Sequence, residues 1–253
     1  MKFILKLYLF AITSLTFPQD IIGDGLYGDE LILYLQNNYR SDNILGYDSA
    51  RDAMYGDIDN HSGVVSCIYT DFSVDNVPAT NPRPIVHEGG LNCEHIWPQS
   101  LYEGDYPMKN DLHHLRPCKE NVNTARGNQP YDESHDPETN TWYWLSYALD
   151  NPPIQDRDEY SENGDGVFEV KEERKGDIAR TIFYFYTMYS DVASNTFFEE
   201  QTNTMLAWHS MDVVDENEID RTSDIAQYQG KPNPFILDET LVERCYFYQE
   251  NIM

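Results

Sequence analysis

The sequence is short of basic residues. Its 253 residues include 17 Lys and Arg against 44 Asp and Glu, which gives a formal net charge of −27. A surface this acidic keeps a protein soluble and repels polyanions, so by itself it argues against a nucleic-acid partner. Residues 108–131 are the exception, because they contain four basic and two acidic side chains. The basic patch of this acidic chain therefore falls in that window.

Long apolar runs are also scarce. After the first 17 residues, no segment is long and apolar enough to cross a bilayer. In that first run, Lys2 and Lys6 frame an apolar stretch that ends near Phe17, as in a secretory signal peptide. We therefore expect residues 1–18 to be a signal peptide and residues 19–253 to form a secreted or periplasmic domain. No membrane contact and no obligate protein partner are expected.

Cysteine is sparse, with four residues at Cys67, Cys93, Cys118 and Cys245. Export would make these cysteines candidates for disulfides, and four cysteines allow three full pairings. We expect Cys67 to pair with Cys93, because Cys67 lies on the predicted strand that precedes Cys93. Cys118 and Cys245 could then pair or stay free.

Aromatic residues are abundant, and 19 Tyr, 11 Phe and 4 Trp supply enough buried area for a globular core. No internal repeat is present, so one α+β domain dominated by helices is expected. Residues 175–190 carry apolar side chains around most of a helix, which predicts a helix near the middle of the core. Apolar spacing and turn residues predict the other elements: helices at 28–42, 47–56 (ended by Gly56), 205–208 and 213–221; strands at 64–72 and 167–170; a strand or short helix at 141–149; irregular chain at 77–90 and 228–235.

Residues 92–128 concentrate the chemistry of the chain, with the segments NCEHIWPQSL and DLHHLRPCKENVNTARGN. A neutral His95 titrates near working pH and can take a proton from water. Glu94 offers the hard anionic oxygen that suits a magnesium-class cation. Adjacent residues of a regular strand point to opposite faces, so both reach one site only if the strand bulges or ends there.

A helix is predicted at 119–126, with Pro117 just before it as a typical start. Within this helix the i, i+3 spacing places Asn123 on the same face as Arg126. A strand that carries His95, a connection, and a helix that carries Asn123 would form a compact ββα unit at about residues 91–128.

Five segments in order, NCEHIWPQSL, DLHHLRP, VNTARGN, KGDIART and QGKPNPFI, resemble the secreted endonuclease I family, which belongs to the His-Me finger (ββα-metal) nucleases. The resemblance covers roughly residues 47–236. It implies a secreted, metal-dependent, sequence-nonspecific endonuclease that leaves 5′-phosphate ends on DNA, with RNA left open as a substrate.

The resemblance also implies roles for individual residues. His95 would be the general base, and Glu94 and Asn123 would bind a single Mg²⁺, with Mn²⁺ or Ca²⁺ as substitutes. The family uses an arginine near the scissile phosphate, but in the corresponding connection this chain has only Lys109. Lys109 is therefore the first candidate for that role, with Arg126 and Arg116 behind it. Further substrate contacts are expected from Lys119 and Asn128, and structural support from Asn92, Trp97, Asp111, His113 and His114.

Two other interpretations are open. In the first, a cluster of cysteines and histidines (Cys93, His95, His113, His114 and Cys118) would hold a structural zinc ion in an interaction module, although the spacing fits no zinc-finger pattern. In the second, the chain would be a catalytically inactive protein that binds nucleic acid.

Overall fold

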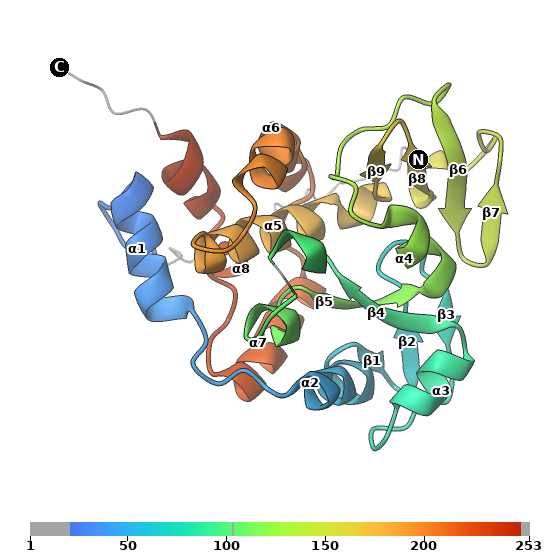
Figure 1. The fold of residues 1–253 in the computed structure, drawn as a ribbon, viewed down its shortest axis with the longest axis horizontal. Helices are drawn as coiled ribbons and strands as arrows, with labels where there is room; N and C mark the ends of the chain where they lie inside the picture. The colour runs from blue at the N-terminus through green and yellow to red at the C-terminus, as the bar shows by residue number, and fades with distance from the viewer. Residues whose placement is uncertain (1–20, 103, 249–253) are drawn as a thin grey trace, which may run out of the picture.

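Helix α5 (Lys175–Tyr189) runs through the centre of the fold (Figure 1). Each of its residues except Tyr186 is buried, because helices α1 (Gly28–Tyr39), α6 (Asn195–Met211) and α8 (Pro234–Leu237) contact it. A helix enclosed in this way is apolar on most sides rather than along one stripe. The prediction of a buried helix at residues 175–190 is confirmed.

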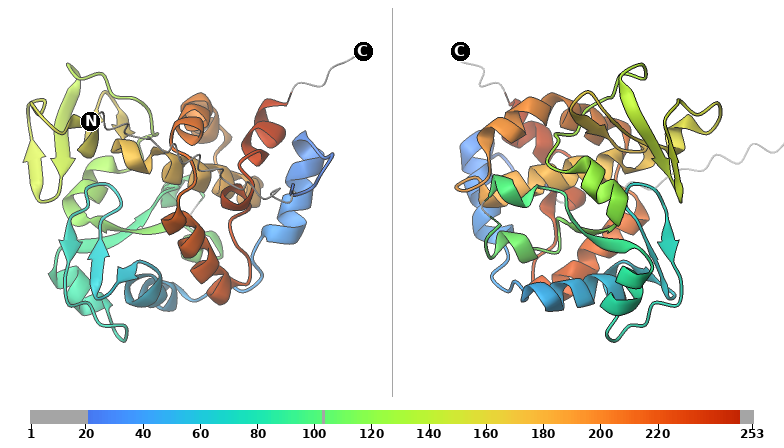
Figure 2. Two further views of the ribbon diagram at one scale, coloured as in Figure 1. Left: turned by 180° about the vertical axis from the view of Figure 1, so that it is seen from behind. Right: turned by 45° about the vertical axis from the view of Figure 1, so that its right-hand side comes forward.

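The computed structural model describes residues 21–102 and 104–248, and the predicted signal peptide lies outside them. The architecture is α+β and mostly helical, as predicted, with helices around α5 and three small antiparallel sheets to one side (Figure 2). Within the described ranges, no helix is long and apolar enough to cross a membrane.

The predicted ββα unit is present, and we call it the finger. Strands β4 (Leu91–His95) and β5 (Leu115–Lys119) form an antiparallel pair in which His95 lies opposite Leu115, and helix α4 (Glu120–Arg126) follows directly. Pro117 lies within β5 rather than at the start of a helix. A proline is tolerated there because a two-stranded ribbon consists of edge strands. Its carbonyl accepts a hydrogen bond from the Ile68 amide.

The other two sheets flank the finger. One contains β1 (Asn60–His61), β2 (Val64–Ser66) and β3 (Ser73–Val74). The other has the order β7-β6-β8-β9, with β6 (Thr139–Trp144), β7 (Tyr147–Leu149), β8 (Ser161–Gly164) and β9 (Val167–Glu169). Residues 141–149, for which strand and helix were both open, therefore form a hairpin.

Several predicted boundaries were wrong. The strand at 64–72 ends at Ser66, and the loop at 77–90 contains helix α3 (Arg83–Glu88). Helix α2 (Tyr47–Ala53) does not stop at Gly56 but continues as a π-helix (Met54–Ile58). A Cβ atom at Gly56 would lie 2.5 Å from the Ala79 carbonyl oxygen, so this glycine permits a close backbone approach. Helix α7 (Glu216–Gln229) begins after the N-cap Asp215 and extends into the expected turn at 228–235.

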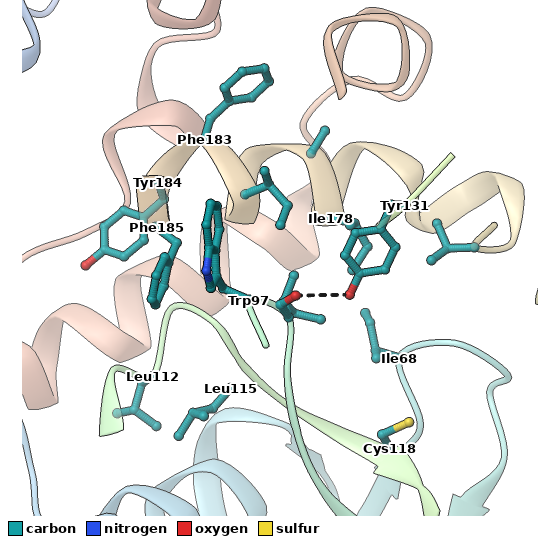
Figure 3. Close-up of a cluster of buried hydrophobic side chains, with 14 of the residues drawn as sticks. Ile68, Trp97, Leu112, Leu115, Cys118, Tyr131, Ile178, Phe183, Tyr184 and Phe185 are labelled. Atoms are coloured by element: carbon teal, nitrogen blue, oxygen red, sulfur yellow. Dashed lines mark hydrogen bonds between the residues drawn. The ribbon is translucent and has the colours of Figure 1, made fainter. Parts of the chain in front are cut away.

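The finger packs onto α5 through aromatic side chains. Trp97, which follows β4, is fully buried and stacks on Phe185 of α5 with ring centroids 4.9 Å apart (Figure 3). Leu112 and Leu115 lie on the finger side of the same core. The finger therefore rests on the most enclosed helix of the molecule.

Candidate active site

His95, the last residue of β4, has a defined tautomer. Its Nε2 lies 3.0 Å from the carbonyl oxygen of Lys109, and a carbonyl can only accept, so Nε2 carries the proton. The other ring nitrogen, Nδ1, is then unprotonated and accepts a hydrogen bond from Gln99 Nε2 at 3.2 Å. Burial, and secondarily the charge of nearby His114, lowers the pKa of His95 well below its usual value. The histidine is therefore a neutral base with its lone pair on Nδ1.

Glu94 is a buried carboxylate, 3% exposed, and one of its oxygens accepts two hydrogen bonds. Tyr69 donates to Oε1 at 2.8 Å, and Arg126 Nη1 donates to the same oxygen at 3.2 Å. Oε2 receives no side-chain donor from the described residues. Burial raises the pKa of Glu94 even though Arg126 and Tyr69 oppose the shift. A cation beside Oε2 would offset that desolvation cost.

Asn123 on α4 presents a second hard oxygen donor. Its Nδ2 donates to Asn92 Oδ1 at 2.8 Å and to the Cys93 carbonyl at 3.3 Å, and the carbonyl fixes the amide orientation. Its Oδ1 accepts no hydrogen bond from a described residue. Glu94 Oε2 and Asn123 Oδ1 are hard oxygen donors. Two protein ligands of this kind suit Mg²⁺, which usually keeps several of its waters.

A basic and aromatic group, Arg51, Tyr47 and Lys109, lies beside His95, and we call it the Tyr47 cluster. The Tyr47 ring is 5.8 Å from the His95 ring, with the Arg51 guanidinium 4.2 Å and the Lys109 ammonium 4.9 Å from its centroid. Lys109 is predicted from the sequence to lie near the scissile phosphate. No role near His95 is predicted from the sequence for Arg51 or Gln99. Gln99 lies in the segment NCEHIWPQSL, four residues after His95. This short spacing is the sequence feature that could have predicted its contact with the histidine.

The other predicted cationic residues lie elsewhere. Arg126 is 1% exposed and donates to Glu94 and to the carbonyls of His95, Ile96 and Gly127, so it lies beneath the site rather than facing substrate. Arg116 is 5% exposed and lines a separate cavity of about 350 Å³ behind β5, which contains none of Glu94, His95 and Asn123. Burial, then the charge of Arg221, lowers the pKa of Arg116 to about 10.

The remaining predicted substrate contacts lie near the ends of α4. Lys119 donates to the Leu145 carbonyl at 3.3 Å and lies over the Phe72 ring. Asn128 is exposed just after the helix. Both are accessible to a ligand, and neither contacts His95 among the described residues.

Of the residues expected to give structural support, Trp97, Asp111, His113 and His114 are buried around the finger, and Asn92 is partly buried. Asp111 accepts from Tyr184 and Tyr189 of α5 and from Gln229 of α7. His113 and His114 contact the carbonyls of Lys231 and Met108 through Nε2. From α7, Arg221 donates to the carbonyls of Leu112 and Leu115, and Gln229 accepts from the Leu112 amide. The connection between the two finger strands is thus held by the C-terminal third of the chain.

The two buried histidines predict a pH dependence of stability. Burial lowers the pKa values of His113 and His114 to about 4, whereas in the unfolded chain both titrate near 6.5. Between these values the unfolded chain binds protons that the folded chain does not. The contribution of the two neutral histidines to the free energy of unfolding is therefore complete above pH 6.5. It is lost as pH falls toward 4, by roughly 3 kcal/mol for each histidine.

His113→Gln isolates this effect, because the glutamine amide can donate in place of Nε2 but does not titrate. Urea unfolding at pH 7 and pH 4.5 should show the stability of the variant relative to the wild type improving at the lower pH. A difference in stability that is the same at both pH values would contradict the assignment.

The cysteines are arranged differently from the expectation. Cys67 lies beside Cys118, with Sγ atoms 3.8 Å apart, rather than beside Cys93, and the four cysteines are free thiols. The strand register explains the difference. Cys118 pairs with Asn92 across the ribbon, so Cys93 and Cys118 point to opposite faces. Cys67 packs on the Cys118 face, where its sulfur accepts from the Lys119 amide.

We expect oxidation to join Cys67 to Cys118. Burial raises the pKa of Cys67, but hydrogen bonds with Cys118, Thr70 and the backbone outweigh it and bring the pKa to about 7, which favours the nucleophilic thiolate. Exchange with glutathione disulfide would form the Cys67–Cys118 bond and release two glutathione molecules. Peptide mapping without reduction should find this link, with Cys93 and Cys245 alkylated. A Cys67–Cys93 link would restore the original expectation.

The zinc interpretation finds no support in this geometry. In residues 21–102 and 104–248, no group of three or more His, Cys, Asp or Glu side chains is arranged to hold a metal ion. The Nε2 atoms of His113 and His114 are hydrogen-bonded to different backbone carbonyls, and the Cys93 thiol donates to the Glu94 carbonyl.

A ββα finger that carries an oriented histidine and two hard oxygen donors is typical of ββα-metal nucleases. The sequence pattern that defines the Endonuclease I family matches residues 27–239, and the chain belongs to this family. It is 30% identical over 166 residues to the "Extracellular ribonuclease" of Bacillus subtilis (strain 168), which is 58% of this chain and 51% of that protein. The "Extracellular ribonuclease" of Bacillus amyloliquefaciens is also 30% identical, over 168 residues, with the same coverage. The chain thus spans about half the length of these curated relatives.

Proposed function

We propose that this protein is a secreted, metal-dependent, sequence-nonspecific endonuclease that cleaves DNA and RNA to products with 5′-phosphates. The observation that carries the proposal is the tautomer of His95, whose unprotonated Nδ1 lies at the end of the strand that also carries Glu94. The similarity to proteins named extracellular ribonucleases supports RNA as a substrate and supports an exported location.

His95 acts as the general base in this mechanism. Its Nδ1 accepts a proton from the water that attacks phosphorus, and the Lys109 carbonyl stabilises the resulting imidazolium by accepting from Nε2. The Gln99 amide, which donates to Nδ1 in the resting site, must give way to that water. Glu94 Oε2 and Asn123 Oδ1 would hold a Mg²⁺ ion. When bound, that ion neutralises charge at the phosphate and at the departing 3′-oxygen.

The Tyr47 cluster is the proposed phosphate contact. Lys109 brings a positive charge beside His95 in a protein whose net charge is −27, and Arg51, which is paired with Asp48 in this structure, could add a second if a phosphate displaced that carboxylate. Lys109 offers a point charge to a phosphate, whereas Arg51 could offer a bidentate fork only after its Nη2 exchanges Asp48 for the phosphate.

Digestion of plasmid DNA and of a defined RNA by the purified mature chain tests the proposal. Cleavage of both substrates with Mg²⁺, loss of activity with EDTA and recovery with Mn²⁺ are expected. Products should accept a labelled phosphate from polynucleotide kinase only after phosphatase treatment. Products with 2′,3′-cyclic phosphates, or cleavage that survives EDTA, would contradict the mechanism.

A further inference from the structure

Two buried tyrosines connect to Glu94 from outside the finger. The Tyr69 hydroxyl donates to Glu94 Oε1 at 2.8 Å, and the hydroxyl oxygens of Tyr69 and Tyr131 are 2.6 Å apart. Both side chains are fully buried. We call these residues the tyrosine pair.

The direction of the hydrogen bonds follows from the number of protons. An ionised carboxylate can only accept, so the single proton of Tyr69 goes to Glu94. The 2.6 Å contact must then be a donation from Tyr131 to Tyr69, since the alternative acceptor of Tyr131, the Ile96 carbonyl, is 3.4 Å away. The chain of donors thus runs from Tyr131 to Tyr69 to Glu94.

Packing holds this chain of donors in place. The Tyr69 ring lies 4.9 Å from the Phe168 ring of β9, and the Arg126 guanidinium lies 4.4 Å from the centroid of the Tyr131 ring. Neither ring can rotate its hydroxyl away without disturbing a buried neighbour. With Oε1 fixed by Tyr69 and Arg126, the carboxylate plane is set. The His95 backbone amide also donates to this carboxylate, but Oε2 receives no side-chain hydrogen bond from the described residues, so it can accept a further partner.

We propose that Tyr69 is a positioning residue for the divalent cation: its hydroxyl orients the Glu94 carboxylate so that Oε2 is presented to the ion. This inference rests on the proposed function, in which Glu94 is a metal ligand. Residues that orient metal ligands commonly change metal affinity 10- to 100-fold when they are replaced. Tyr69→Phe removes the orienting bond and keeps the ring, so it should act on metal binding rather than on the chemical step.

The chain offers a matched control in Tyr55. This tyrosine is also fully buried, but its hydroxyl has no hydrogen-bond partner among the described residues. Tyr55→Phe therefore removes the same atom from a buried site near the finger without breaking a bond to Glu94.

The test measures Mn²⁺ binding to the full mature chain without nucleic acid, by calorimetry and by electron paramagnetic resonance. Tyr69→Phe should raise the Kd for Mn²⁺ about tenfold, and Tyr55→Phe should leave it within about twofold of wild type. In cleavage assays, the Mg²⁺ concentration for half-maximal rate should rise by a similar factor in Tyr69→Phe, with the rate at saturating Mg²⁺ close to wild type.

Unchanged Mn²⁺ affinity in Tyr69→Phe, or equal weakening in Tyr55→Phe, would overturn the inference. If Tyr69→Phe does not fold, Tyr131→Phe keeps the test available, because it removes the second donor and should weaken Mn²⁺ binding to a smaller extent. A wild-type protein that binds Mn²⁺ but cleaves neither DNA nor RNA would refute the proposed activity. The affinity comparison would still decide the role of Tyr69.

Discussion

Replacement of His95 by alanine is expected to lower the cleavage rate about 10³-fold, within the range that general-base catalysis contributes. The physical reason is the loss of the lone pair on Nδ1, the atom that the Lys109 carbonyl keeps unprotonated by accepting from Nε2. Binding of substrate and cation should change little, because Glu94, Asn123 and the Tyr47 cluster remain. The effect should therefore appear in kcat rather than in KM.

His61→Ala is the matched control, since His61 is an exposed histidine on β1. It should cleave DNA and RNA at close to the wild-type rate. Mn²⁺ binding by His95→Ala, measured without nucleic acid, confirms that the variant is folded at the site. A His95→Ala protein that keeps more than about a tenth of the activity would refute the general-base role.

Arg126→Ala is expected to lower the free energy of unfolding by about 3–5 kcal/mol. The substitution leaves the Glu94 carboxylate buried without the Arg126 guanidinium that pairs with it. It also removes the hydrogen-bond donor to the carbonyls of His95 and Ile96. Breaking a buried ion pair from one side is costly because the remaining charge stays desolvated. Urea unfolding monitored by tryptophan fluorescence measures the change.

Two variants make this prediction specific. Arg157→Ala breaks an ion pair with Asp136 in which both side chains are more than two-fifths exposed, and it should cost at most about 1 kcal/mol. The double variant Arg126→Ala with Glu94→Gln should recover part of the loss, because the residual charge is gone. If Arg126→Ala costs no more than Arg157→Ala, the buried pair does not stabilise the finger.

Much of the scaffold could be predicted from local sequence. Apolar spacing located α1 and α5, and the segment around Glu94 and His95 located the finger, because these elements follow from periodicity and residue chemistry within one stretch. The adjacency of Glu94 and His95 posed a problem for a regular strand. In the structure β4 ends at His95, which is one of the two arrangements that would allow both side chains to reach one site.

The contacts that surround the site could not be predicted in this way. Tyr69 reaches Glu94 across 25 positions of sequence, and Cys67 reaches Cys118 across 51. No local pattern marks Tyr69 among 19 tyrosines, and only the fold distinguishes it. The sequence predicts that Arg126 contacts the scissile phosphate, because its charge and its position in a helix can be seen there. Its burial depends on how α4 packs against β4, which the local sequence does not show.

The supports of the finger from α7 also affect the order in which the protein can become active. Glu94, His95 and Asn123 are all synthesised early, but Gln229 follows its partner Asp111 by 118 positions, and Arg221 follows Leu112 by 109. Contacts this distant in sequence form only once the intervening chain is available. A nascent chain that ends before α7 would contain every proposed catalytic group without the supports that hold them. If the proposed nuclease activity requires these supports, it can appear only after α7 has been synthesised.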